Sequence, residues 1–173
     1  MREEKEVATL KSDEQKLLFV IQQHAGRSMH YDFRLEYGGK LISWAIPKGP
    51  STNPSKKQLA IKVNDHPLPY ASFEGIIPEG HYGAGPVIVW DRGTYTNLKK
   101  SSISSCEKKG IIEVWLDGEK LKGGYALIHA ALKDKDSWLF VKMKDEYADP
   151  SRTITQELQA SVVSGKTIED MRS

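Results

Sequence analysis

Cysteine and long apolar runs are almost absent from this sequence. Cys106 is the single cysteine among 173 residues, which excludes a disulfide within the chain and fits a reducing compartment. The charged first residues, Met1 to Glu6, are followed by no long apolar stretch. A secretory signal and a membrane span both need such a stretch. We therefore expect a cytoplasmic protein.

An excess of charge of either sign is also lacking. The 25 basic and 23 acidic residues leave a formal net charge of +2, so a nucleic-acid partner would have to be bound by a local patch. We find no internal repeat, coiled-coil heptad or low-complexity tract. With 39% hydrophobic residues, the chain can bury one sizeable core. We predict a single domain, residues 17–173, after a charged lead-in, residues 1–16.

Short β-like runs separated by turn signals make up most of the chain. The Gly38-Gly39 and Asp117-Gly118 pairs suit two-residue turns that need positive φ, and residues 47–54 indicate a longer irregular loop. Because closure removes exposed sheet edges, we predict an all-β, mainly antiparallel fold that forms a closed eight-stranded β-barrel in preference to a sandwich. The expected strands are residues 18–24, 29–37, 41–46, 59–63, 87–90, 111–116, 125–132 and 138–143.

The pattern changes after the last of these runs. Residues 153–156 predict a short helix that begins with a capping box. Ser164-Gly165 would interrupt this helix before a final turn at residues 167–171. We expect these helical turns, residues 153–171, to pack on the outside of the barrel.

The segment HYDFRLE, residues 30–36, carries the strongest functional signal. On a strand, His30, Asp32 and Arg34 share one face and the apolar residues between them share the other. Same-face neighbours lie roughly 6.5 to 7 Å apart, so His30 and Asp32 can converge on one metal ion with Arg34 beside it for an anion. Each residue alone would be typical of the solvated face of a sheet.

A second run supports the same site. Residues 19–24 have strand-like character and include Gln22 and His24. Two strands would then direct polar groups to one place, and we expect the imidazole and carboxylate donors to converge within the closed barrel.

Seven strings follow one another along the chain: FVIQ (19–22), HYDFRLE (30–36), SWAIPKGP (43–50), DHP (65–67), FEGIIPEGHYGAG (73–85), VWDRG (89–93) and WLFVK (138–142). Taken together in this order, they resemble the 3′-phosphoesterase domain of bacterial DNA ligase D, which also occurs as a free-standing protein. The resemblance implies a compact β-barrel that binds manganese, or another divalent transition metal, and removes 3′-phosphates from DNA or RNA ends. In some members it also implies removal of 3′-terminal ribonucleosides. The implied setting is DNA end repair, with a separate DNA ligase or end-joining proteins as partners.

The resemblance also implies roles for individual residues. Its metal ligands fall on His24, His30 and Asp32. Its phosphate-binding groups fall on Arg34, Lys48, His66 and Tyr70, and Gln22 matches a supporting position. We take the catalytic residues to be His30, Asp32, Arg34, His66 and Tyr70.

These residue types suit phosphate hydrolysis. Two imidazoles and one carboxylate leave coordination positions open for water and a phosphate oxygen. The planar fork of Arg34 can bind two further oxygens. His66 can hydrogen-bond the phosphate or protonate the departing oxygen, and the sequence does not separate these roles. Tyr70 can anchor an oxygen or simply pack on the barrel.

Other polar residues give weaker signals. Glu74, His81, Tyr82 and Asp91 are nearby candidates, whereas His129 lies in an apolar run and is read as a core residue with its hydrogen bonds satisfied.

Two other functions remain open. His30 and Asp32 with a distant His66 or His129 imitate the two-histidine, one-carboxylate site of non-haem iron oxygenases. No arginine for a co-substrate carboxylate follows either distant histidine closely. The other alternative is a non-catalytic module that binds nucleic-acid ends.

Overall fold

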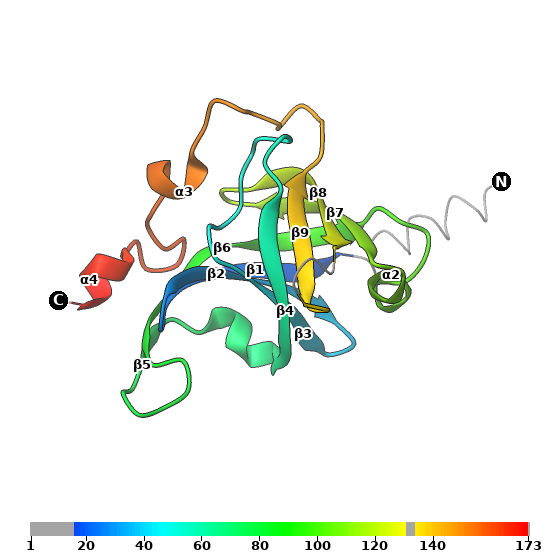
Figure 1. Cartoon of the computed structure of the whole chain (residues 1–173). Coiled ribbons are helices and arrows are strands. Elements are labelled where there is room, and N and C mark those ends of the chain that lie inside the picture. Colours follow the sequence, from blue (N-terminus) through cyan, green and yellow to red (C-terminus); the bar gives the residue numbers. More distant parts are fainter. Residues whose placement is uncertain (1–15, 131–133, 173) are drawn as a thin grey trace.

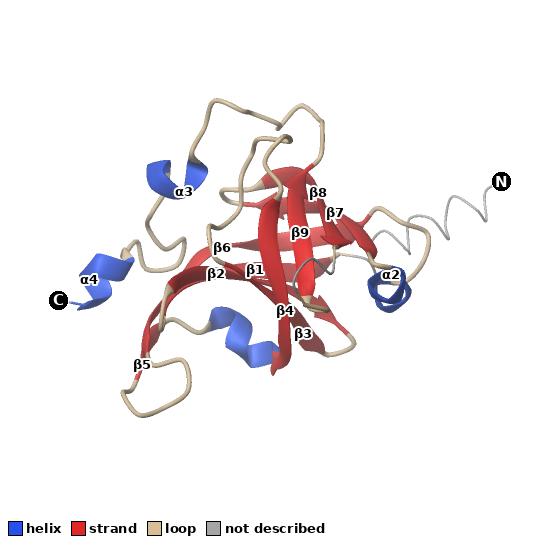
Figure 2. Cartoon of the chain, in the orientation of Figure 1, coloured by secondary structure: helices blue, strands red, loops and turns tan. Residues whose placement is uncertain are grey.

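The structure, a computed structural model, describes residues 16–130 and 134–172, and these residues form one antiparallel sheet of nine strands with short helices (Figures 1 and 2). The strands are β1 (Leu17–Ala25), β2 (Met29–Tyr37), β3 (Lys40–Ile46), β4 (Gln58–Pro67), β5 (Gly75–Ile77), β6 (Gly85–Asn97), β7 (Ile111–Gly118), β8 (Lys122–His129) and β9 (Ser137–Lys142). The helices are η1 (Leu68–Ser72), α2 (Ile103–Lys109), α3 (Ile154–Glu157) and α4 (Ile168–Arg172).

Eight of the strands close into a barrel. The order is β1-β2-β3-β4-β9-β8-β7-β6, and β6 pairs with β1 to complete the circle. This confirms the predicted all-β fold and the closed eight-stranded barrel. The short β5, which we did not predict, adds to β6 outside the circle through pairs such as Ile76 with Pro86.

Several strands are longer than predicted, β4 and β6 by the most. β4 continues past Val63 to Pro67 and so carries His66, and β6 extends over 13 residues. The lead-in prediction concerns residues 1–16, of which all but Lys16 lie outside the described residues.

The two predicted glycine turns have different outcomes. Gly38 and Gly39 have φ of 63° and 81° and connect β2 to β3, as predicted. The prediction for Asp117-Gly118 was wrong, because both residues belong to β7 and the chain reverses at the next two residues. Gly118 is required for space: a Cβ there would lie 2.5 Å from Oδ2 of Asp91 and 2.6 Å from Cζ of Phe19.

The main core fills the barrel with large aromatic and branched side chains. The Phe140 ring lies 4.8 Å from Phe33 and stacks on Tyr125 at 4.9 Å between centroids. Tyr31, Phe33 and Leu35 of β2 all belong to this core. The alternate residues of β2 therefore face away from it.

The helices lie outside the barrel, as Figure 2 shows for α3 and α4. Sequence analysis missed α2, although Ser102 caps its start by accepting a hydrogen bond from the Ser105 amide and Gly110 ends it at φ 85°. The predicted capping box was wrong, since the Thr153 side chain makes no cap hydrogen bond. Instead Glu157 accepts from the Thr153 amide at 2.9 Å.

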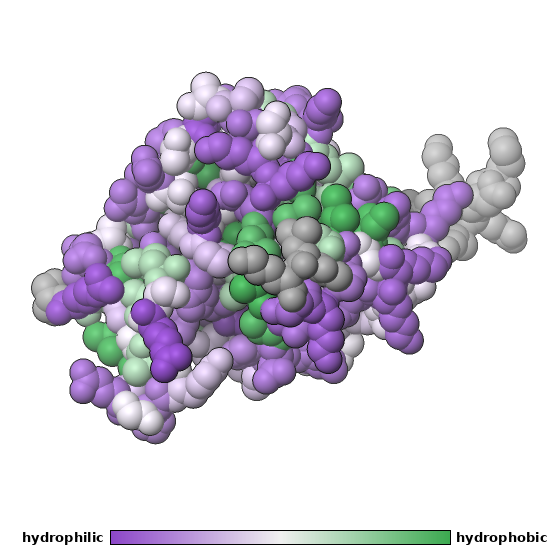
Figure 3. Space-filling view, viewed as in Figure 1, coloured by the Kyte–Doolittle hydropathy of each residue, from purple (hydrophilic) through white to green (hydrophobic). Residues whose placement is uncertain are grey.

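The surface in Figure 3 is mainly hydrophilic, with apolar side chains gathered beside β8 and β9. Leu59 of β4, Ile111 of β7 and Ile128 of β8 are large exposed apolar residues. Among the described residues, no helix has the length and apolar character needed to cross a membrane.

Candidate active site

The hairpin of β1 and β2 places the predicted residues side by side. His24 lies opposite His30, and Gln22 lies opposite Asp32. Directly opposed residues of an antiparallel pair project to the same face with Cβ atoms about 5 Å apart. The hairpin register therefore brings two imidazoles, a carboxylate and a carboxamide together on one patch of sheet.

This patch lies on the outer wall of the barrel. The core side of β2 is taken by Tyr31, Phe33 and Leu35, so Asp32 and Arg34 point the other way. Our expectation that the donors converge within the closed barrel was wrong. They are not splayed into solvent either, because Asp32 and Arg34 are 6% and 3% exposed.

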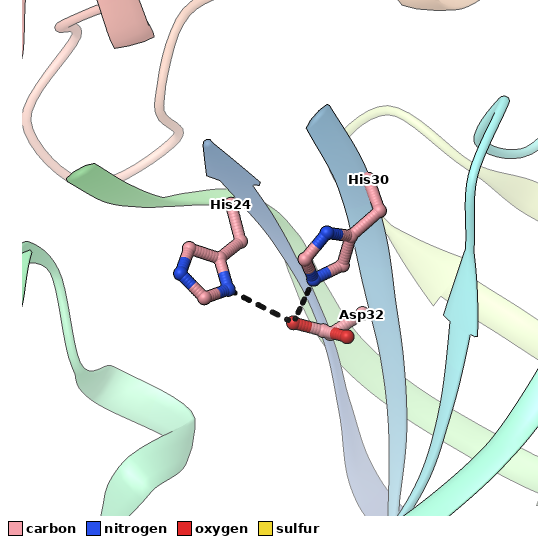
Figure 4. Close-up of side chains that lie close together, drawn as sticks. All are labelled: His24, His30 and Asp32. Atoms are coloured by element: carbon pink, nitrogen blue, oxygen red, sulfur yellow. Dashed lines mark ion pairs between the residues drawn. The ribbon is translucent and has the colours of Figure 1, made fainter. Parts of the chain in front are cut away.

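Three donor atoms form a candidate metal site, shown in Figure 4. Oδ2 of Asp32 lies 3.8 Å from Nδ1 of His24 and 3.3 Å from Nε2 of His30. The donor atoms of the three residues lie within 4.8 Å of one another. Two imidazole nitrogens and one carboxylate oxygen are ligands that Mn²⁺, Zn²⁺ and Fe²⁺ accept. The residues therefore fit a divalent transition metal.

Backbone carbonyls orient both imidazoles. Nε2 of His24 lies 2.6 Å from the carbonyl oxygen of Gly83, and Nδ1 of His30 lies 3.0 Å from that of Ser28. A carbonyl only accepts, so these ring nitrogens must carry the protons. In the neutral rings the nitrogens that face Asp32 then carry the lone pairs, whereas a protonated His30 donates from Nε2 to Asp32. This arrangement of outer partners is common around metal-binding histidines.

Asp32 is ionised at neutral pH. Burial opposes its charge, but the imidazoles of His24 and His30 and the guanidinium of Arg34 outweigh burial and hold its pKa well below the usual range. For His30, burial is opposed by the hydrogen bond and charge of Asp32, which together raise the imidazole pKa. A negative, buried carboxylate is suited to hold a cation.

Arg34 lies beside the metal donors and is fixed by several partners. Nη2 lies 3.3 Å from Oδ2 of Asp32, and Nε donates to Oε1 of Gln22 at 2.6 Å. Nη1 donates to Oγ of Ser43 at 2.9 Å and to Nδ1 of His66 at 3.1 Å. A guanidinium has five N–H donors, so these contacts with described residues leave one N–H of Nη2 without an acceptor.

Two contacts meet at Nδ1 of His66. Nη1 of Arg34, which can only donate, lies 3.1 Å away, and the carbonyl oxygen of Asn64, which can only accept, lies 3.2 Å away. When Nδ1 accepts from Arg34, the proton of the neutral ring lies on Nε2. Burial and the nearby charge of Arg34 lower the pKa of His66. A neutral His66 in that tautomer directs its N–H away from Arg34.

Helix η1 covers the guanidinium with an aromatic ring. Nε2 of Gln22 donates to the carbonyl oxygens of Tyr70 and Phe73 at 2.8 and 3.1 Å and so ties η1 to β1. The Tyr70 ring lies 5.1 Å from Cζ of Arg34 and packs between His66 and Phe73. Burial raises the pKa of its hydroxyl. Among the described residues this hydroxyl has no hydrogen-bond partner, so it can bind a ligand.

The structure thus brings together seven predicted residues: Gln22, His24, His30, Asp32, Arg34, His66 and Tyr70. It does not bring Lys48 to them. Lys48 is exposed in the loop after β3 and makes no hydrogen bond or ion pair with any described residue.

The residues that gave weaker signals in the sequence either support the fold or lie exposed on the surface. Glu74 accepts from the Val89 amide and from Oγ of Ser161, and Asp91 accepts from three amides of residues 119–121, so both hold the fold together. His81 and Tyr82 are exposed in the loop before β6. The prediction that His129 is a core residue was wrong: it is exposed and packs on Trp138.

Three functional partners were missed from the sequence. Ser43 lies opposite Arg34 in the β2–β3 register, which the Gly38-Gly39 turn already fixes, so it could have been found by counting outward from that turn. Ser28 and Gly83 contribute only backbone carbonyls, for which the sequence holds no signal.

Comparison with known proteins gives a consistent result. Residues 22–129 match the family described as the DNA ligase D 3′-phosphoesterase domain. The chain is 48% identical over 155 residues to the multifunctional non-homologous end joining protein LigD of Pseudomonas aeruginosa, covering 88% of this chain and 18% of that protein. The LigD of Mycobacterium tuberculosis is 48% identical over 128 residues, 74% of this chain and 16% of the relative. The chain spans less than a fifth of these relatives.

Proposed function

The chain belongs to the DNA ligase D 3′-phosphoesterase family, and on that premise we propose that it is a metal-dependent phosphoesterase that converts 3′-phosphates at DNA or RNA ends to 3′-hydroxyls. The observation that carries this proposal is the 3.3 Å pair between Arg34 and Oδ2 of Asp32, the same oxygen that lies near both imidazoles. One residue thereby joins a cation site to an anion site.

A 3′-phosphomonoester is doubly charged near neutral pH and hydrolyses extremely slowly without a catalyst. Stabilisation of the charge that develops on its oxygens is therefore the main requirement. Two opposite unit charges about 4 Å apart attract by roughly 4 kcal/mol at an effective dielectric of 20, before desolvation costs. The site is buried and holds Arg34 in a fixed position, so it can stabilise this negative charge.

We assign the metal to His24, His30 and Asp32, with Mn²⁺ as the proposed ion. When bound, it would polarise a phosphate oxygen and acidify a water molecule. The lone pairs that His24 and His30 direct at Asp32 support this assignment.

Arg34 binds the phosphate through the remaining N–H of Nη2 and through its charge. We had predicted that the guanidinium of Arg34 binds two phosphate oxygens. That would require one of its present contacts to break. Tyr70 offers its hydroxyl to a second oxygen. Nε2 of His66 points away from Arg34, and in the tautomer whose Nδ1 accepts from Arg34 it donates a hydrogen bond to the phosphate or to the departing 3′-oxygen.

The setting follows from the relatives, whose names place them in non-homologous end joining. We propose that this chain cleans 3′ ends in DNA repair before a ligase or other end-joining proteins act on them. Removal of 3′-terminal ribonucleosides stays a prediction of the family resemblance. The oxygenase alternative needed His66 or His129 as the third ligand, whereas His66 contacts Arg34 and His129 is exposed on β8.

A primer with a 3′-phosphate tests the proposal. Purified protein with Mn²⁺ should release inorganic phosphate, and Asp32→Asn should abolish the release. His129→Ala is the matched control, because it removes an exposed imidazole outside the site. Tight binding of the primer without phosphate release by the wild-type protein would favour the end-binding module instead.

A further inference from the structure

The loop of residues 78–84 connects β5 to β6 and projects from the barrel beyond β5 (Figure 1). Its backbone is folded on itself: the His81 amide donates to the carbonyl of Pro78 at 3.3 Å, and the Ala84 amide donates to that of His81 at 3.1 Å. Gly80 and Gly83 have positive φ values of 87° and 77°, which these turns require. The loop therefore has a defined shape.

This loop is attached to the metal site. The carbonyl of Gly83 accepts the 2.6 Å hydrogen bond from His24, and a Cβ on Gly83 would lie 3.2 Å from Cε1 of the same imidazole. At the end of the loop, a Cβ on Gly85 would lie 2.0 Å from the carbonyl oxygen of Ala25. The loop backbone is thus packed tightly against the end of β1 that carries His24.

Tyr82 precedes Gly83 and is fully exposed. The tyrosines Tyr31, Tyr95 and Tyr125 are buried, and Tyr70 packs over Arg34. This aromatic ring lies in solvent, one residue from a carbonyl that orients a metal ligand, and makes no hydrogen bond or ring contact with the described residues. Its position suits a planar ligand group that enters the site from solvent.

We propose that Tyr82 is a nucleoside-binding residue that stacks on the terminal base of the strand whose 3′-phosphate is bound at Arg34. This inference rests on the proposed function and adds a base subsite to it. Every base has a π face, so stacking would be tolerant of sequence. The polar residues Arg34, His66 and Tyr70 would bind the phosphate, and Tyr82 would hold the nucleoside attached to it.

Such a subsite would bind the 3′ end of a strand whatever the identity of its terminal base. Stacking of one base on an aromatic ring is worth about 1 to 3 kcal/mol by alanine substitution, which corresponds to roughly 5- to 150-fold in affinity. Tyr82 would contact the face of the base and not its edge. The chain would therefore accept any terminal base and bind an abasic terminus more weakly.

Two primers separate this role from a structural one: a 3′-phosphate primer with a normal terminal base and the same primer with an abasic terminal residue. Tyr82→Ala should raise KM at least about fivefold for the normal primer and leave KM and kcat for the abasic primer unchanged. Tyr82→Phe and Tyr82→Trp should restore the wild-type KM. Tyr147→Ala is the control, because Tyr147 is a part-exposed tyrosine that packs on Trp115.

A primer that ends in the fluorescent base 2-aminopurine gives an independent readout. Wild-type protein should quench its fluorescence on binding, and Tyr82→Ala should lose the quenching while Tyr82→Phe keeps it. Equal quenching by wild type and Tyr82→Ala, or equal loss of activity by Tyr82→Ala on both primers, would overturn the proposal. Quenching without phosphate release by the wild type would instead support the subsite and refute the proposed hydrolysis.

Discussion

Oε1 of Gln22 accepts a 2.6 Å hydrogen bond from Nε of Arg34 inside the protein, where Gln22 is completely buried and Arg34 nearly so. The other end of the same carboxamide donates to the carbonyls of Tyr70 and Phe73. One side chain therefore sets the orientation of the guanidinium and the position of the helix that covers it. A neutral residue links the two parts of the candidate phosphate site.

Replacing Gln22 should weaken both parts. In Gln22→Leu, Nε of Arg34 and two backbone carbonyls lose their partners, and an unsatisfied buried polar group costs about 1 to 3 kcal/mol. We expect a loss of that order in the free energy of unfolding, measured by urea titration, and a lower kcat for phosphate release. Gln23→Leu is the control, since among the described residues the Gln23 side chain hydrogen-bonds only the Met29 sulfur. Equal effects of the two changes would contradict this role.

Arg34→Lys should lose activity although the charge is kept. A lysine ammonium cannot reproduce the fixed fork that contacts Gln22, Ser43, His66 and Asp32. We expect kcat/KM for phosphate release to fall about 100-fold, comparable to the loss of one preorganised donor in other enzymes. Arg92→Lys, at an exposed position on β6, should have little effect. Near wild-type activity in Arg34→Lys would show that charge alone is sufficient.

Glu74 should make stability depend on acid pH. Burial is outweighed by hydrogen bonds from Ser161, Ser164 and the Val89 amide, so the pKa of Glu74 lies below its ordinary value of 4.5. A carboxylate with a lowered pKa stabilises the fold above its ordinary pKa, and this contribution is lost as the pH falls through the folded-state pKa.

Urea unfolding at several pH values measures this contribution. Glu74→Gln should be less stable than wild type at pH 7, and the difference should shrink as the pH is lowered below about 4.5. Glu79→Gln, in the exposed loop, is the matched control. A difference between wild type and Glu74→Gln that is the same at all pH values would rule out a role for the charge.

Gly118→Ala should destabilise the barrel. The added Cβ would meet Oδ2 of Asp91 and the Phe19 ring at 2.5 and 2.6 Å, and overpacking of a tight core typically costs about 1 to 3 kcal/mol. Asp91 also accepts the amides of Lys120 and Leu121, so its displacement would disturb the turn. Gly75→Ala is the comparison, with its nearest contact at an ordinary 3.5 Å. A thermal midpoint for Gly118→Ala that matches Gly75→Ala would refute this reading.

Local patterns predicted much of this molecule. The alternation in HYDFRLE correctly separated His30, Asp32 and Arg34 from the core residues, because side chains on a strand alternate strictly. The Gly38-Gly39 turn was recognised because both positions need positive φ. These features depend on neighbours in sequence.

Features that depend on distant contacts were not predicted. We predicted that the site lies inside the barrel, and this was wrong. The alternation of residues in HYDFRLE separates the two faces of the strand but does not indicate which face the barrel encloses. Gly118 looked like a turn residue, yet it is a glycine because Asp91 and Phe19 approach it from other strands. The Gly83 carbonyl that orients His24 comes from 59 residues away. The spacing of residues along the sequence does not indicate which distant residues come into contact in the fold.

The central claim is that His24, His30 and Asp32 hold a divalent cation beside Arg34. Titration of Mn²⁺ into the protein, followed by electron paramagnetic resonance of the free ion, measures this directly. We predict one site per chain in the wild type, no such site in Asp32→Asn, and an unchanged site in His129→Ala. Equal Mn²⁺ binding by wild type and Asp32→Asn would contradict the account.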